Sequence, residues 1–242
     1  AKAITLSSTD ADSGDTMTYS IVSDVSNGST SLSGTTVTYT PTANWNGTDT
    51  FTYKVNDGTG DSNTSTITIT VAAVNDAPVS SAVSASTNED TAKAITLSAT
   101  DVEGSSLTYS VVATNDGSVS ISGATATYTP DANWNGTDTF TYKANDGTVD
   151  SNTATVTVTV AAVNDAPTSA DEGITTNEDT AVRTGFSSSD IEGDALTYSV
   201  VTQPSNGTVT IDNSNSEPGL YTPTANWNGT DTFTYKANDG TV

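Results

Sequence analysis

The feature that most constrains this chain is a ten-residue word that occurs three times. Residues 44–53 read Asn-Trp-Asn-Gly-Thr-Asp-Thr-Phe-Thr-Tyr, and the same ten residues return at 133–142 and 226–235. Trp45, Trp134 and Trp227 are therefore 89 and 93 positions apart. Long identical words in register exclude a mere bias toward Thr and Asp, and they predict a tandem array of one kind of domain.

Two shorter words give the boundaries of the repeats. Asn-Asp-Ala-Pro stands at 75–78 and 164–167, and Asn-Glu-Asp at 88–90 and 177–179, each pair 89 residues apart. We expect a first repeat at 1–74 that lacks its first strand, a complete repeat at 75–163, and a third repeat at 164–242 that lacks its last strand. Repeats cut at both ends indicate a segment of a longer array, with neighbouring repeats as its partners.

The hydrophobic pattern of the middle copy has a period of two throughout. Ile95 and Leu97 alternate with Thr and Ser, and the apolar residues of 107–111, 140–144 and 156–160 alternate with polar residues in the same way. Clusters of Gly, Asn, Asp and Pro separate these runs as turns. With an opening strand near 79–86, about seven short strands result, and no segment has a helical apolar stripe. The sequence therefore predicts an all-β fold, a tandem array of seven-stranded antiparallel β-sandwiches of the immunoglobulin type.

Charge and composition exclude several classes of function. The chain has 29 acidic and 6 basic residues, a formal net charge of −23, and neither His nor Cys. Six dispersed cations cannot form the basic face that nucleic acid requires. Without His and Cys the chain lacks the usual ligands of zinc and haem and the nucleophile of thiol chemistry, and it cannot form a His-based catalytic triad. No apolar run approaches the roughly 18 residues of a membrane span, so we expect no membrane insertion.

The acidic residues gather in the turns and linkers around the two predicted junctions. They stand beside Asn side chains and backbone carbonyls, a set of hard oxygen ligands that suits Ca²⁺. Carboxylates brought together repel one another unless a cation neutralises them, and basic residues are too few for that task. Each cluster alone is an ordinary turn former, but recurrence around a linker favours calcium. The clusters are Asn75-Asp76, Asp101/Glu103 and Asn145-Asp146 at the first junction, and Glu89-Asp90, Asn164-Asp165, Asp190/Glu192 and Asn238-Asp239 at the second.

These words resemble a known family. The stretches 88–104 and 107–110 resemble the opening half of a cadherin repeat, and Asp10-Ala11-Asp12-Ser13-Gly14 resembles the cadherin Asp-x-Asp loop. The closing strand and linker, 143–167, are similar to their cadherin counterparts. Because the Trp word is not typical of animal cadherins, the chain most resembles the bacterial cadherin-like tandem repeats of large repeats-in-toxin adhesins and other extracellular proteins.

The resemblance implies calcium ions at the junctions as the cofactor. It implies ligands from the upstream repeat, the linker and the downstream repeat. The second junction would use Glu89, Asn164, Asp165, Asp190, Glu192 and Asp239. The first would use Asn75, Asp76, Asp101, Glu103 and Asp146, with its upstream Glu lying before residue 1. Asp10, Asp12 and Asp57 would serve a further junction.

The chain departs from the animal pattern in two places. Its linker is Val-Asn-Asp-Ala-Pro, one Asn and one leading Asp shorter. No Leu-Asp-Arg-Glu motif is present, and near its place only Asp49 and Asp138 are candidates. Fewer ions per junction than in animal cadherins are therefore expected.

The leading functional hypothesis is a calcium-rigidified spacer of a large extracellular or cell-surface adhesin. One alternative is a calcium-dependent carbohydrate-binding module in which Trp45, Trp134 and Trp227 stack on a surface glycan, although each Trp fits better as a structural residue in a turn. Another is a homophilic adhesion or filament-forming module, which the negative charge opposes unless calcium screens it. Catalysis is not expected, because the same loops recur in every copy.

Overall fold

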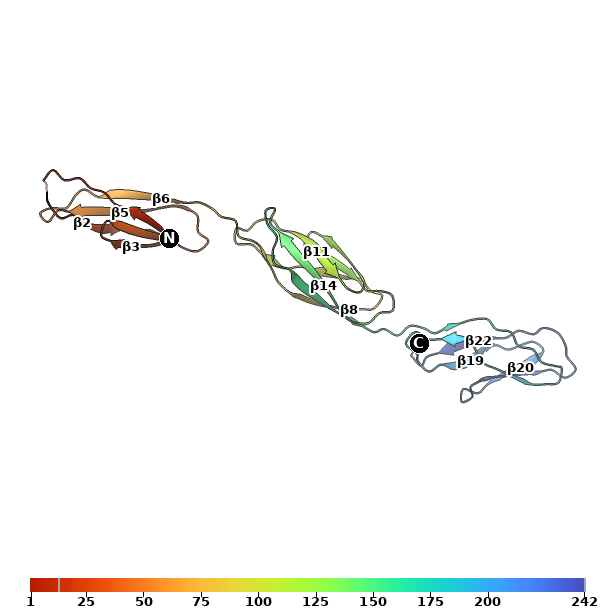
Figure 1. The fold of residues 1–242 in the computed structure, drawn as a ribbon. Coiled ribbons are helices and arrows are strands. Elements are labelled where there is room, and N and C mark those ends of the chain that lie inside the picture. Colours follow the sequence, from red (N-terminus) through yellow and green to blue (C-terminus); the bar gives the residue numbers. More distant parts are fainter. Residues whose placement is uncertain (13, 242) are drawn as a thin grey trace. The chain divides into compact units, whose positions relative to one another are not determined.

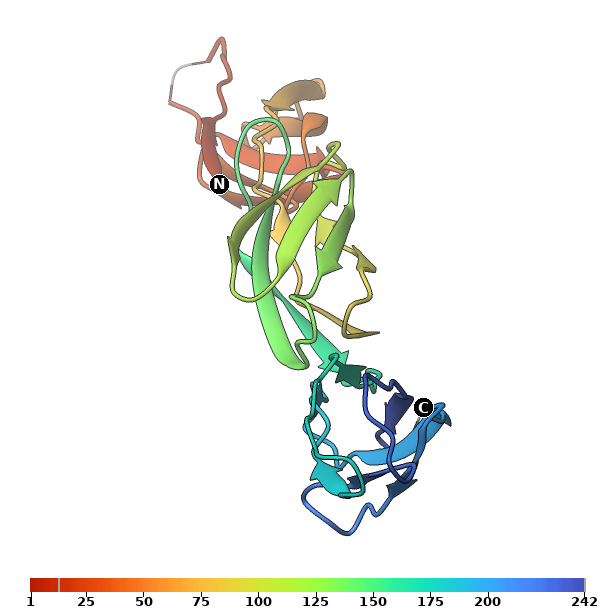
Figure 2. The same cartoon turned by 90° about the vertical axis from the view of Figure 1, so that its right-hand side faces the viewer.

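A computed structural model describes residues 1–12 and 14–241. The chain divides into two compact units: Ala1–Ser81 with Ser98–Ser110 and Lys143–Thr153, and Ala82–Leu97 with Val111–Tyr142 and Ala154–Val242. Both views draw the described chain as arrows and loops only (Figure 1, Figure 2). In those residues no helix is long and apolar enough to cross a membrane.

The first repeat is built from two three-stranded sheets, ordered β1-β4-β3 and β2-β5-β6. Phe51 and Tyr53 alternate with threonines along β5 and lie in the core with Val37 of β4. This is the predicted period of two, with the apolar face turned inward. The strands are β1 Lys2–Thr5, β2 Thr18–Ser23, β3 Gly28–Ser33, β4 Thr36–Pro41, β5 Gly47–Asn56 and β6 Ser65–Val71.

The middle repeat carries a larger sheet, β11-β14-β15-β8, and a smaller one, β12-β13-β9. The predicted inward residues Phe140, Tyr142 and Ala144 of β14 are all 2% exposed or less. The remaining two-residue strands, β7 and β10, pair with each other. The strands are β7 Val79–Ser80, β8 Val83–Asn88, β9 Lys93–Thr96, β10 Ala99–Thr100, β11 Thr108–Thr114, β12 Ser118–Ser122, β13 Thr125–Thr129, β14 Gly136–Asn145 and β15 Ala154–Ala161.

The opening strand of the middle repeat differs from the expectation. The sequence predicts one strand near 79–86, whereas the chain forms two, β7 and β8, which belong to different sheets. β8 then runs parallel to β15, from Val83 opposite Val156 to Asn88 opposite Ala161. Of the two, β7 pairs with β10 in a separate two-stranded sheet, and β8 forms the edge of the larger sheet.

The third repeat has the sheets β17-β21-β20, β19-β22 and the short pair β16-β18. Its core includes Val209 and Tyr221, which are 3% and 8% exposed. No strand is assigned between Ser169 and Val182, where the middle repeat has β8. The strands are β16 Thr168–Ser169, β17 Val182–Thr184, β18 Ser188–Ser189, β19 Thr197–Thr202, β20 Gly207–Ile211, β21 Gly219–Pro223 and β22 Thr234–Asn238.

Candidate metal sites at the repeat junctions

Glu89 secures the start of the second linker. It follows β8 directly, and its backbone N–H donates to the Ala161 carbonyl oxygen over 2.9 Å. Its side chain is 3% exposed, and its carboxylate accepts a hydrogen bond from the backbone N–H of Val163. The end of the middle repeat thus presents a buried carboxylate beside the linker.

The linker of the second junction is hydrogen-bonded to two acidic loops. The Asn164 side-chain amide donates to Asp239 Oδ2 over 2.7 Å, and the backbone N–H of Asp165 donates to Glu192 Oε2 over 3.4 Å. Asp190 Oδ1 accepts from the backbone N–H of Glu192 over 3.1 Å. The structure therefore brings the predicted residues of this junction into one neighbourhood.

The first junction repeats this arrangement. The Asn75 amide donates to Asp146 Oδ2 over 2.7 Å, and the backbone N–H of Asp76 donates to Glu103 Oε2 over 3.2 Å. The hydrogen bond from Asn75 is the main reason that the pKa of Asp146 lies below its ordinary value of 3.8. Two junctions with different flanking sequences thus share the same contacts.

One carboxylate oxygen at each junction is buried without a hydrogen-bond partner. These atoms are Asp101 Oδ2 at the first junction and Asp190 Oδ2 at the second. The other oxygen of Asp101 accepts from the backbone N–H of Ser105 over 2.8 Å, as Asp190 Oδ1 does from neighbouring N–H groups. A buried carboxylate oxygen without a donor is costly unless a cation compensates it.

Two residues outside the predicted ligand set also face the second linker. Asp90 Oδ1 accepts from the backbone N–H of Asn133 over 3.0 Å. With its NH₂ group turned toward them, the Asn133 amide donates to Asp165 Oδ2 over 3.0 Å and to Asp90 Oδ2 over 3.2 Å. Asn133 belongs to the Trp word, and nothing in that word indicates that its side chain reaches a linker 32 residues further on.

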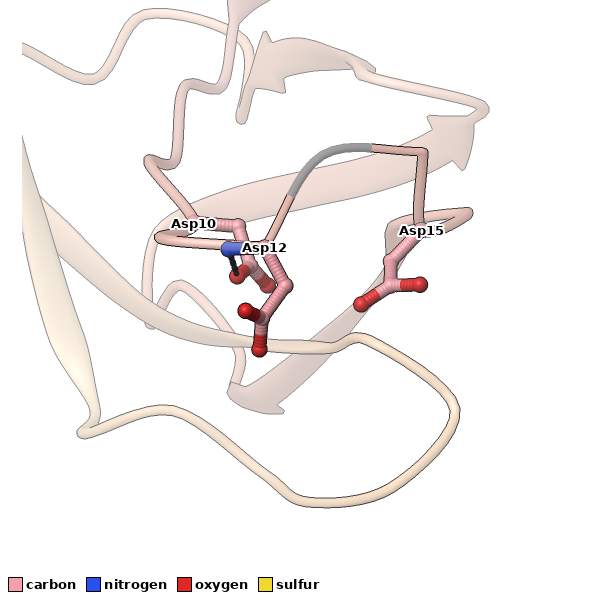
Figure 3. Close-up of side chains that lie close together, drawn as sticks. All are labelled: Asp10, Asp12 and Asp15. Atoms are coloured by element: carbon pink, nitrogen blue, oxygen red, sulfur yellow. Dashed lines mark hydrogen bonds between the residues drawn. The ribbon is translucent and has the colours of Figure 1, made fainter.

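In the first repeat the acidic cluster differs from the prediction. The carboxylates of Asp10, Asp12 and Asp15 have oxygens within 4.8 Å of one another, all exposed (Figure 3). Asp10 Oδ1 accepts from the backbone N–H of Asp12 over 2.8 Å. The predicted third member, Asp57, accepts instead from the N–H groups of Thr59 and Gly60, although it lines the same hollow as Asp10. Asp15 therefore lies in this cluster although it is not among the ligands predicted from the sequence.

The acidic residue inside the Trp word has a structural role. Asp49 is 4% exposed, and its carboxylate accepts from the backbone N–H groups of Ser26 (3.0 Å), Asn27 (2.9 Å) and Thr50 (3.0 Å) and from the Tyr39 hydroxyl (3.3 Å). Asp231 makes the equivalent contacts in the third repeat. Donors within the same repeat thus satisfy these carboxylates. We call this arrangement the clamp: a buried carboxylate whose hydrogen bonds hold the turn before the next strand.

The clamp predicts a defined dependence of stability on pH. Burial acts to raise the pKa of Asp49, but the hydrogen bonds from Ser26, Asn27, Thr50 and Tyr39 outweigh it and hold the pKa below 3.8. A lowered folded-state pKa stabilises the fold above the unfolded-state pKa of about 3.9, and this stabilisation is lost as pH falls through the folded-state pKa. Asp49→Asn should therefore lower the melting temperature at pH 7, by an amount that decreases as pH falls below the unfolded-state pKa and through the lower folded-state pKa.

Thermal unfolding followed by circular dichroism between pH 2.5 and 8 measures this effect. Glu217→Gln, which removes an exposed carboxylate, is the control and should leave the curve unchanged. A difference between Asp49→Asn and the parent chain that persists undiminished at pH 2.5 would contradict the assignment.

The three Trp rings lie against their own glycine turns. A Cβ built on Gly136, whose φ is 142°, would lie 3.2 Å from Trp134 Cζ2, and Gly47 and Gly229 have the same relation to Trp45 and Trp227. Each ring is half-buried. This packing is the structural role expected from the sequence, and carbohydrate stacking stays an untested prediction.

The sandwiches and their sheet order define a tandem array of immunoglobulin-like domains. A family model described as the bacterial Ig domain matches the chain three times, over residues 1–70, 75–159 and 164–242. The chain therefore belongs to the bacterial Ig domain family. The predicted all-β sandwich array is confirmed, and so is the resemblance to bacterial cadherin-like repeats.

Three of the solved structures that match this chain are compared with it. Extracellular cadherin domains 1–5 of protocadherin gamma B2 are 16% identical over 92% of this chain and 49% of theirs, with a TM-score of 0.50. The protocadherin gamma B4 extracellular domain is 17% identical over 93% of this chain and 42% of its own, with a TM-score of 0.49. An endo-fucoidan hydrolase of glycoside hydrolase family 107 is 17% identical over all of this chain and 42% of its own, with a TM-score of 0.34.

The likeness to protocadherin gamma B2 shows the fold alone, and the two structures with TM-scores below 0.5 carry no argument. The chain spans less than half of the length of each of the three structures, and the score for the hydrolase carries no argument about catalysis. No curated protein matches the chain.

Proposed function

We propose that this chain is a spacer segment of a large extracellular or cell-surface adhesin, and that Ca²⁺ ions bound at its repeat junctions make it rigid. The observation that carries the proposal is the shared geometry of the two junctions. Each has an Asn side chain and a backbone N–H of the linker bonded to two acidic loops, and each has one buried carboxylate oxygen without a donor.

The chemistry of the donor set favours calcium. It contains only carboxylate, amide and carbonyl oxygens, and Ca²⁺ takes six to eight such ligands in flexible geometry. Lys143, which precedes Asp146 of the first junction, is paired with Asp150, and Lys54 of the first repeat is paired with Asp61. The residues that would hold calcium are those predicted from the sequence, joined at the second junction by Asp90 and at the first repeat by Asp15.

Binding at these places would act on the linkers. An ion held by linker and loop together would fix the linker relative to the repeat that follows it. At the second junction, Glu89 and Asn133 would extend this restraint to the repeat before it. The affinity expected for extracellular sites, about 10⁻⁴–10⁻³ M, suits a calcium-rich medium. Bacterial Ig and cadherin-like domains are typically extracellular and non-catalytic, in agreement with this role.

The test compares the chain in 10 mM CaCl₂ with the chain in chelator. For a dissociation constant of about 10⁻⁴ M, each occupied site adds about 2.7 kcal/mol of stability, so the melting temperature should rise by several degrees. Small-angle X-ray scattering should show a longer maximum dimension with calcium. MgCl₂ at equal ionic strength controls for screening of the charge.

Variants identify the sites. Asp101→Asn and Asp190→Asn should each remove one junction's share of calcium binding in titration calorimetry, whereas Glu217→Gln should bind as the parent chain does. An unchanged melting temperature and an unchanged maximum dimension with and without calcium would overturn the proposal.

A further inference from the structure

Two neighbouring strands, β8 and β15, are those by which the chain enters and leaves the middle repeat. β8 Val83–Asn88 follows the first linker with only the two-residue β7 between them, and β15 Ala154–Ala161 ends shortly before Val163 of the second linker. Tension applied to this repeat through its two linkers therefore acts on β8 at its first residue and on β15 at its last.

The parallel pairing of these strands fixes how that tension acts. Val83 lies opposite Val156 at one end of the pairing, and Asn88 lies opposite Ala161 at the other. The two loaded residues, Val83 and Ala161, are thus at opposite ends, and tension pulls the two strands past each other along their own axes. Backbone hydrogen bonds loaded in this way share the force and must break together, whereas strands pulled apart at one end lose their bonds one after another.

The side chains that face the core also oppose sliding. Val156 and Val158 are fully buried, and the β8 residues opposite them, Val83 and Ala85, are half-buried. Because side chains alternate between the two faces, a slip of β8 by one residue would turn its exposed serines toward the core. The strands therefore cannot shift to a neighbouring register without opening the whole pairing.

Glu89 lengthens this pairing beyond its last residue pair. The backbone N–H of Glu89 donates to the Ala161 carbonyl oxygen over 2.9 Å, and the buried Glu89 carboxylate accepts from the backbone N–H of Val163. We call the six β8–β15 residue pairs together with these two Glu89 contacts the shear ladder. It is fastened on both sides of the point at which β15 ends.

The strand before β8 is held by fewer contacts. The Ser80 backbone N–H donates to Asn152 Oδ1 over 2.9 Å, and the Asn152 amide donates to the Ser80 carbonyl oxygen over 3.0 Å. β7 pairs with β10 over two residues only. Tension from the first linker meets these contacts first and the longer shear ladder after them.

We propose that the shear ladder makes the middle repeat a load-bearing unit that resists tension along the chain. A spacer between a surface and an adhesion target is stretched whenever one moves relative to the other, so the biological use of this strength rests on the proposed spacer function. The strength itself depends on the direction of the strands and on their hydrogen bonds, and it requires no calcium.

The experiment pulls the same repeat of the full chain in two directions by single-molecule force spectroscopy. Because the chain has no Cys, two introduced Cys residues are its only attachment points. Ala82→Cys with Ala166→Cys loads the shear ladder along its strands. Ala82→Cys with Thr155→Cys pulls the strands apart at one end, where the contacts of Ser80 with Asn152 also open in turn. The three attachment positions are exposed.

Direction should decide the force of unfolding. The force should be at least about twofold higher along the strands than across them, because several backbone hydrogen bonds then break together. Release of roughly 250 Å of chain identifies the middle repeat in both cases. The two variants should have the same melting temperature, so a difference in force cannot come from thermodynamic stability. Equal forces in the two directions would overturn the proposal.

Proline variants locate the strength in the shear ladder. The Glu89 N–H points to β15, and alternate residues of a strand point to the same side, so the Ala85 N–H also faces β15 and the Ser86 N–H faces the open edge. Under constant force along the strands, Ala85→Pro should unfold at least about tenfold faster than Ser86→Pro, its matched control. Equal rates would contradict the assignment, and the comparison of directions stays decisive if Ala85→Pro fails to fold.

Calcium separates this inference from the proposed function. The force in chelator tests the shear ladder alone. If calcium also binds Glu89 and the second linker, the force along the strands should rise further when calcium is added. A high force along the strands with no gain from calcium would support the shear ladder and count against the calcium site. Equal forces in the two directions with a gain from calcium would support the calcium site and overturn the shear ladder.

Discussion

Replacing Asp138 with alanine should unfold the middle repeat at a temperature about 10–20 °C lower than in the parent chain. The Asp138 side chain is 3% exposed, and its carboxylate accepts from the backbone N–H groups of Asp116 (3.3 Å) and Thr139 (2.6 Å). It also lies beside Tyr128, whose pKa is raised by burial first and by this carboxylate second. Removing a buried carboxylate that satisfies part-buried backbone donors costs about 2–4 kcal/mol.

The matched control lies in the same turn. Asp116→Ala removes an exposed carboxylate but keeps the backbone N–H that Asp138 accepts, so it should change the melting temperature by no more than a degree or two. Differential scanning calorimetry resolves the transitions of the repeats. If Asp116→Ala and Asp138→Ala lowered the melting temperature equally, the lost stability would come from the removed charge and not from the hydrogen bonds of Asp138.

Replacing Glu89 with alanine should destabilise the middle repeat and also reduce its response to calcium. The Glu89 carboxylate is buried and holds the backbone N–H of Val163. Loss of a hydrogen bond to a charged group costs about 1.5–3 kcal/mol, even in chelator. In calcium the deficit should grow, because the second junction then loses a proposed ligand. Melting curves without calcium measure the stability lost with the hydrogen bond to Val163, and curves with calcium add the loss of the proposed ligand.

Glu178→Ala provides the internal comparison for this prediction. Glu178 stands in the same Asn-Glu-Asp word, but its side chain is exposed. This variant should melt as the parent chain does in both conditions. An effect of Glu178→Ala as large as that of Glu89→Ala would show that the word itself, and not its contact with the linker, stabilises the repeat.

The sandwich fold was predictable from particular residues. Phe140, Tyr142 and Ala144 alternate with polar residues, and the structure buries all three. Alternation identifies the face of a strand that turns inward, but it does not identify the neighbouring strand. The parallel pairing of β8 with β15 therefore could not be read from the pattern, nor could the split of the opening segment into β7 and β8.

The candidate sites were predictable in part. The grouping of Asn75 with Asp146, and of Asp76 with Glu103, follows the recurrence of acidic turns. The contact of Asn133 with Asp165 does not, because it depends on how the Trp-word turn is oriented toward a linker far along the chain. The approach of Asp15 to Asp10 and Asp12 was likewise not predictable, because loop conformation decides which neighbouring carboxylates converge.

By itself, the sequence determined the repeat, the strand faces and the concentration of oxygen ligands near two linkers. Only the tertiary structure decided what each carboxylate does. Asp138 lies near the start of β14 and Asp190 directly follows β18, yet one is satisfied by backbone N–H groups and the other keeps a buried oxygen without a donor. The physical reason is that strand patterns are local, whereas the donors around a buried carboxylate come from chain segments brought together by folding.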